Sequence, residues 1–218
     1  SSYLLLDSQS DPAFVRGSGG CRFGGDTEFL TGAEVAEMIK YVALLRGINV
    51  GGNKLIKMAE LSRIFASLGL KNVRTYIQSG NVLFESSKAD SVALTKHIET
   101  SLHKAVGFEV PVVLRTIAEL ESIVKLNPFS KIKPDADVTL YVTFLVEKLK
   151  TKPKAPLQSP KKDCEIIHLN PREVFTVAFA MPNGRYGESM AFIEKEFGKS
   201  ATTRNWNTVI KILALAQP

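Results

Sequence analysis

The order of strand and helix patterns after Met38 limits the folds open to this chain more than any other feature. Six consecutive segments carry the hydrophobic spacing of a buried strand or of an amphipathic helix. They are 40–46, 58–68, 73–78, 81–85, 90–107 and 110–114. Read as strand, helix, strand, strand, helix and strand, they match the ferredoxin-like, or split βαβ, unit. Residues 38–115 are therefore predicted to form one such unit.

The remaining residues, 116–218, partly repeat this order. Their strand patterns cover 138–145, 164–169 and 173–179. Segment 150–162, which holds three prolines and five lysines, is expected to be an exposed loop. A last helix is predicted to begin at residues 202–205, where a second unit would have its final strand. We predict an α+β protein of two related ferredoxin-like (split βαβ) halves, 38–115 and 116–218, that ends in a C-terminal helix.

The charge of the chain is unevenly distributed. The 218 residues carry a formal net charge of +6. Residues 1–37 hold two basic and six acidic side chains, a net charge of −4, which leaves +10 on the other 181 residues. This first segment contains no lysine, is rich in glycine and has no sustained periodicity. We predict a poorly structured extension that the fold does not need, either natural or introduced in cloning, with a regulatory arm as the alternative.

Composition excludes several classes of protein. Two cysteines, Cys21 and Cys164, cannot build a disulfide framework or a four-thiolate zinc site, and no other metal-ligand motif occurs. No apolar run approaches the roughly 18 residues of a transmembrane helix, so no membrane association is expected. We predict a cytoplasmic protein without a metal site.

Three polar motifs stand out in the chain. They are Ala43–Gly52 (ALLRGINVGG), Arg74–Val82 (RTYIQSGNV) and Ala201–Val209 (ATTRNWNTV). In this order they resemble a largely bacterial domain-of-unknown-function family, DUF1697, over roughly Met38 to the C-terminus. The resemblance implies a cytoplasmic α+β protein with two related βαβ-type halves, and it implies no reaction. Residues 1–37 have no counterpart in the family pattern.

The first motif continues into a glycine-rich loop between a strand and a helix. A phosphate-binding P-loop requires Gly-Lys-Ser/Thr after four residues, whereas here Asn53 separates Gly52 from Lys54 and the hydroxyl is missing. An NTPase of that type is therefore not expected. Backbone N–H groups of Gly51 and Gly52, with Arg46 and Lys54 nearby, could still bind an anion. The alternative is that the glycines only permit a tight connection.

The other two motifs also allow a structural and a ligand-binding interpretation. Gln78 and Asn81 flank a predicted two-residue turn, Ser79-Gly80, where polar side chains either satisfy the local backbone or face a ligand. Arg204 lies in the predicted start of the last helix. There it could bind a phosphate or carboxylate, or pair structurally with backbone or carboxylate oxygens.

We predict that the chain binds a small anionic or phosphate-bearing ligand in a pocket between its halves, with nucleic acid binding through the basic surface as the alternative. An interaction protein that uses an exposed sheet edge is a third hypothesis. No catalytic residue, cofactor or oligomeric state can be assigned from the sequence. The candidate ligand-binding residues are Arg46, Asn49, Gly51, Gly52, Lys54, Gln78, Ser79, Asn81, Thr203, Arg204 and Asn205.

Overall fold

The computed structural model separates residues 1–35 from a second unit, residues 36–218, which is compact. The described residues are 37–133, 135–150, 153–182, 186–187, 189–198 and 200–217, all within the second unit. Apart from residue 37, the predicted extension lies outside the described residues. The division of the second unit near residue 115 stays a prediction.

The first half forms the predicted strand and helix order around a four-stranded antiparallel sheet. Its sheet order is β2-β3-β1-β4. The elements are β1 (Ile39–Leu45), α1 (Met58–Ser67), β2 (Lys71–Tyr76), β3 (Asn81–Ser86), α2 (Ser91–Val106) and β4 (Val112–Thr116). This is the ferredoxin-like order, so that prediction is confirmed.

The second half forms a five-stranded antiparallel sheet of order β6-β7-β8-β5-β9. It is preceded by α3 (Ile117–Leu126). Its elements are β5 (Val138–Leu145), β6 (Leu157–Gln158), β7 (Cys164–Leu169), β8 (Glu173–Phe179), α4 (Ser189–Phe197), β9 (Ala201–Asn205) and α5 (Trp206–Ala216). The α+β class, the two related halves and the C-terminal helix are therefore as predicted.

Three details differ from the sequence prediction. Residues 202–205 belong to β9 and not to a helix, because Thr202 and Thr203 pair with β5 and only Asn205 caps α5. Segment 150–162 is not wholly a loop, because it contains β6, which pairs with β7. The predicted two-residue turn is a four-residue loop, 77–80, since β2 already ends at Tyr76.

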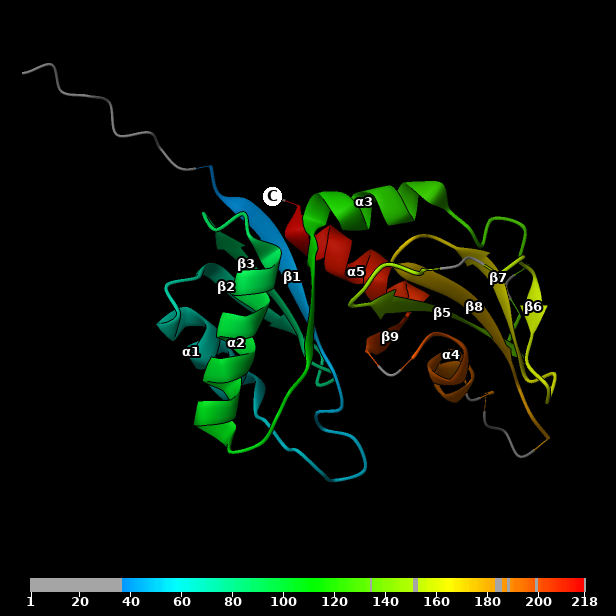
Figure 1. Cartoon of the computed structure of the whole chain (residues 1–218), viewed down its shortest axis with the longest axis horizontal. Helices are drawn as coiled ribbons and strands as arrows, with labels where there is room; N and C mark the ends of the chain where they lie inside the picture. Colours follow the sequence, from blue (N-terminus) through cyan, green and yellow to red (C-terminus); the bar gives the residue numbers. More distant parts are fainter. Residues whose placement is uncertain are drawn as a thin grey trace, which may run out of the picture. The chain divides into compact units, whose positions relative to one another are not determined.

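Helices α3 and α5 lie between the two sheets, as Figure 1 shows. Their apolar side chains, including Leu120, Trp206 and Val209, share one core with the inner faces of both sheets. Helices α1 and α2 cover the outer face of the first sheet, and α4 packs on the outer face of the second. Among the described residues no helix is long and apolar enough to cross a membrane.

The central strands of the two sheets pair with their neighbours in the same register, so positions in these strands of one half have equivalents in the other. Each central strand, β1 or β5, has an equivalent neighbour on either side. The equivalent residues, first half and then second, are Val42 and Val142, Leu83 and Phe175, and Arg115 and Arg204. The largest difference is that α1 has no helical counterpart among the described residues of the second half.

Gly80→Ala is expected to lower the free energy of unfolding by about 2–4 kcal/mol. Gly80 has a φ of +78°, and a Cβ there would lie 2.6 Å from Cδ1 of Ile48 and 2.9 Å from Cβ of Leu45. Gly69→Ala is a matched control, because Gly69 has a φ of +77° and no atom within 4 Å of the added Cβ. Urea unfolding of both variants measures the difference. Equal losses would contradict the packing argument.

Candidate functional site

The three polar motifs meet at Arg204, which extends from β9 into the first half. The side chain is buried and all its hydrogen-bond acceptors are uncharged oxygens. Its Nε donates to Oδ1 of Asn81 at 2.6 Å, and its Nη2 donates to the carbonyl of Leu45 at 2.7 Å. The remaining acceptors are the carbonyls of Ser79, Gly80 and Thr203 and Oγ1 of Thr202.

Each of the three side-chain nitrogens of Arg204 therefore has protein acceptors, six oxygen atoms for five N–H groups. Burial lowers the pKa of Arg204 to about 10, which still leaves the side chain charged at neutral pH. The structural interpretation of this arginine thus accounts for all its donors, and none is left for a ligand in this conformation. The ligand-binding role of the eleven predicted residues as a set stays a prediction.

Two asparagines hold the neighbouring loops in place. Asn81 Nδ2 donates to the carbonyl of Tyr76 at 2.9 Å and to Oγ of Ser79 at 3.2 Å. Asn49 has a φ of +55°, and its Nδ2 donates to the carbonyls of Gln78 and Ile56. These bonds connect the loop after β1 to the loop between β2 and β3. The side chains of Gln78 and Ser79 are exposed beside this connection.

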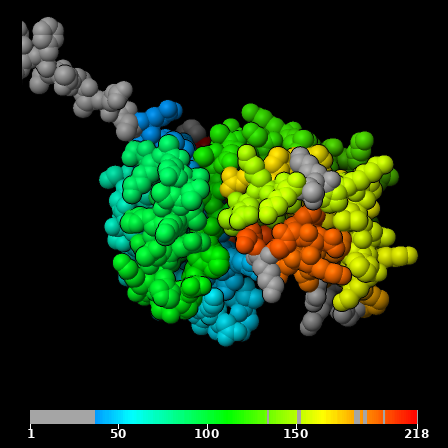
Figure 2. Space-filling view, in the orientation of Figure 1, coloured from blue at the N-terminus to red at the C-terminus, as the bar shows by residue number. Residues whose placement is uncertain are grey.

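Other candidates lie around this junction and make separate contacts. Arg46 forms an ion pair with Glu194 of α4, and Figure 2 shows the loop after β1 next to the orange surface of α4. Lys54 Nζ donates to the carbonyl of Glu109 at 2.9 Å. The exposed Gly51 and Gly52 have positive φ, so they suit the tight connection.

The remaining two candidates belong to β9. Thr203 hydrogen-bonds Thr143 of β5 through their hydroxyls at 2.7 Å. Asn205 caps α5 by accepting from the backbone N–H of Asn207 at 2.9 Å. Asn205 also lines a separate cavity of about 300 Å³ together with Lys133 and Trp206.

Arg115 of β4 makes the reciprocal connection from the first half into the second. Its Nε donates to Oε1 of Glu173 at 2.9 Å in a buried ion pair. Its Nη2 donates to the carbonyls of Leu145 and Arg172, and its Nη1 to that of Leu114. Burial lowers the pKa of Arg115, and the Glu173 carboxylate opposes this shift.

The two arginines occupy equivalent positions and bind equivalent groups. Asn81 and Glu173, which accept from the two Nε atoms, lie opposite Leu44 of β1 and Phe144 of β5. Each Nη2 donates to the last carbonyl of the central strand in the other half. Each half therefore contributes one arginine that binds the other half, and we call Arg115 and Arg204 the exchanged arginines. One is neutralised by a carboxylate, and the other is held by uncharged oxygens.

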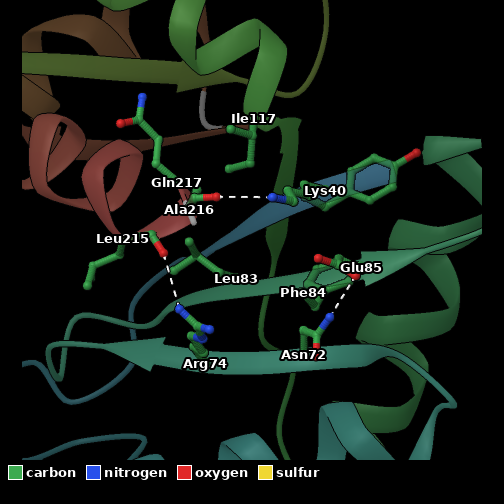
Figure 3. A pocket seen from close by; sticks show the side chains of 11 residues that line it. Lys40, Asn72, Arg74, Leu83, Phe84, Glu85, Ile117, Leu215, Ala216 and Gln217 are labelled. Atoms are coloured by element: carbon green, nitrogen blue, oxygen red, sulfur yellow. Dashed lines mark hydrogen bonds between the residues drawn. The ribbon is translucent and has the colours of Figure 1, made fainter. Parts of the chain in front are cut away.

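A cavity of about 260 Å³ lies elsewhere between the halves, where the inner face of the first sheet meets the end of α5. Figure 3 shows Leu83 and Ile117 near the end of α5, with Lys40, Arg74 and Glu85 around them. The described residues that line it are Lys40, Tyr41, Asn72, Arg74, Leu83, Phe84, Glu85, Ile117, Leu215, Ala216 and Gln217. None of the eleven predicted site residues is among them.

Two cations of this cavity point at the last carbonyls of α5. Lys40 Nζ donates to the carbonyl of Ala216 at 3.4 Å, and Arg74 Nη1 donates to that of Leu215 at 3.5 Å. Glu85 accepts from Nδ2 of Asn72 at 2.7 Å. The two basic side chains and one carboxylate leave the cavity with a net positive charge.

This cavity combines a positive charge with an apolar surface. Leu83 and Ile117 are buried, whereas Lys40 and Arg74 are exposed at its edge. Such a site can hold a molecule with an acidic group and an apolar body. Among the described residues, no group of three His, Cys, Asp or Glu side chains is placed to hold a metal ion.

A family model described as "Protein of unknown function (DUF1697)" matches residues 38–175. The chain belongs to this family. The DUF1697 match includes Lys40, Arg74, Leu83 and Ile117 of the cavity and ends before α5. No curated protein matches the chain.

A solved structure from Streptococcus pneumoniae, described as that of the conserved bacterial protein SP0830, has a similar fold. The two chains are 24% identical, with a TM-score of 0.66. The match covers 83% of this chain and 100% of the other. At this level of identity the similarity supports the fold.

Proposed function

We propose that this protein binds a small anionic molecule in the cavity between the first sheet and α5. The observation that carries the proposal is the placement of Lys40 and Arg74 at the edge of one cavity whose wall includes the apolar side chains of Leu83 and Ile117. A volume of about 260 Å³ restricts the ligand to a small molecule.

The present partners of the two cations leave them able to bind an anion. Their hydrogen bonds to the α5 carbonyls, at 3.4 and 3.5 Å, are longer than the usual range for N–H···O bonds. A carboxylate or phosphate accepts shorter, charge-assisted bonds, and arginine can hold it with two parallel N–H groups. Replacing the long hydrogen bonds to the α5 carbonyls with shorter, charge-assisted bonds to an anion therefore favours ligand binding.

Lys40 and Arg74 also stabilise α5, because cations near a helix C-terminus interact favourably with the helix dipole. This structural role and ligand binding predict different results. If the two side chains only cap the helix, their removal lowers stability and no anion adds to it. If they also bind an anion, the stability of the wild-type protein rises with ligand concentration.

Replacement of both cations, Lys40→Met with Arg74→Met, is expected to weaken anion binding by about tenfold or more, or at least about 1.4 kcal/mol. Isothermal titration with acetate, benzoate and orthophosphate, together with thermal unfolding, measures this effect. Lys96→Met is the control, because Lys96 is an exposed residue of α2 and does not line the cavity.

Failure of all three anions to bind the wild-type protein would overturn the proposal. Equal binding by the wild type and the double variant would overturn the location. Binding of a short oligonucleotide that weakens with salt and survives the double substitution would favour the nucleic acid alternative.

A further inference from the structure

We propose that the anion bound in this cavity is an aromatic carboxylate, whose ring lies between Leu83 and Ile117 and whose carboxylate contacts Lys40 and Arg74. This inference rests on the proposed function and specifies its ligand class. It follows from the equivalence of the two halves, because the second half already carries an aromatic ring at the corresponding place.

The shared register identifies the equivalent positions. Leu83 lies opposite Val42 in the first sheet, and Phe175 lies opposite Val142 in the second. Ile117 is the first residue of α3 after β4, as Trp206 is the first residue of α5 after β9. The two apolar walls of the cavity therefore correspond to Phe175 and Trp206.

In the second half, the space between those two side chains is filled by Phe129. Its ring centroid lies 5.1 Å from that of Trp206 and 6.0 Å from that of Phe175, with interplanar angles of 64° and 71°. Phe129 is only 4% exposed, so it completes the core there. A phenyl ring between a sheet position and the first residue of a helix is thus an arrangement that this fold already contains.

In the first half, a cavity lies at the equivalent place. Its walls, Leu83 and Ile117, have smaller side chains than Phe175 and Trp206, and the cavity that they line has a volume of about 260 Å³. The equivalents of Lys40 and Arg74 are Leu140 and His168. Two basic side chains therefore border the cavity where the filled site has a leucine and a histidine.

These differences define the chemistry of the ligand. The apolar walls favour a ring, since burial of apolar surface contributes about 25 cal/mol per Å². The cations favour a carboxylate on that ring. A rigid ring also loses less conformational freedom on binding than a flexible chain of similar size. Benzoate is the simplest probe with all three properties, and hexanoate is its flexible aliphatic counterpart.

Isothermal titration of the wild-type protein is expected to show benzoate binding about tenfold more tightly than hexanoate, or about 1.4 kcal/mol. Leu83→Phe places a phenyl ring from the wall of the cavity into the space that the ligand ring would occupy. This variant is expected to lose benzoate binding by about tenfold or more while its binding of acetate is retained. Leu83→Met, which conserves volume, is the control for the substitution.

The outcomes separate this inference from the proposed function. If no anion binds, both fail. If benzoate and hexanoate bind equally and Leu83→Phe leaves benzoate binding unchanged, the aromatic assignment is overturned while anion binding stands. The comparison of the two acids in the wild-type protein decides the inference even if Leu83→Phe does not fold.

Discussion

Arg204→Met is expected to lower the free energy of unfolding by about 3 kcal/mol or more, since each buried acceptor left without a donor costs about 1–3 kcal/mol. Methionine fills part of the space but has no N–H group. Oδ1 of Asn81 and the carbonyl of Leu45 would both lose a buried hydrogen bond. Chemical unfolding measured by far-UV circular dichroism gives the difference.

Two further variants test the cause of this loss. Arg63→Met changes an exposed arginine of α1 and is expected to alter stability by no more than about 0.5 kcal/mol. Arg204→Lys keeps the charge but cannot reproduce the planar set of donors, so it is expected to remain strongly destabilised. An Arg204→Met protein as stable as Arg63→Met would contradict the assigned role of Arg204.

Glu173→Leu is expected to destabilise the protein by about 3–5 kcal/mol, because it leaves the buried Arg115 charge without its carboxylate. Glu173→Gln is expected to cost less, since an amide oxygen can still accept from Nε of Arg115. Asn81 already shows this arrangement with Arg204 in the equivalent position. Urea unfolding of the two variants side by side measures the difference.

An exposed glutamate provides the control for the two Glu173 variants. Glu60→Leu, on the surface of α1, is expected to change stability by no more than about 1 kcal/mol. Should Glu173→Leu and Glu173→Gln lose the same stability, the buried charge of Arg115 is not what the Glu173 carboxylate compensates.

Hydrophobic periodicity predicted the order of the main elements because most helices and strands bury an apolar face. That face lies either in the outer core of one half or in the core between the two sheets. The periodicity missed β9, a five-residue strand that runs directly into α5. Thr202 and Thr203 suit either a helix start or a strand, and only their pairing with β5 decides between the two. It also missed β6, since two residues are too few for a periodic pattern.

The candidate site was only partly predictable from the sequence. The three motifs were expected to converge, and their residues do meet at Arg204. Its structural role depends on acceptors such as Leu45, 159 positions away in the chain. One sequence signal marks the two central strands as equivalent: YVALL at residues 41–45 recurs as YVTFL at residues 141–145. The equivalence of Arg115 and Arg204 follows only from the strand register, which pairs them with Val42 and Val142.

Lys40 and Arg74 had no comparable signal. Lys40 is a charged residue at the start of a strand pattern, and Arg74 lies within the second motif. They share one cavity only because the end of α5 packs across the first sheet. Local patterns do not contain that packing, so the sequence favoured Arg46 and Arg204 with the backbone of Gly51 and Gly52 instead.

A crystal structure of the protein with benzoate tests directly whether the cavity between the first sheet and α5 binds an aromatic carboxylate. We expect density for the carboxylate within hydrogen-bond distance of Lys40 Nζ and the Arg74 guanidinium, with the ring between Leu83 and Ile117. Benzoate bound instead at the glycine-rich loop around Gly51, Gly52 and Lys54, or a cavity still empty at saturating benzoate, would contradict this assignment.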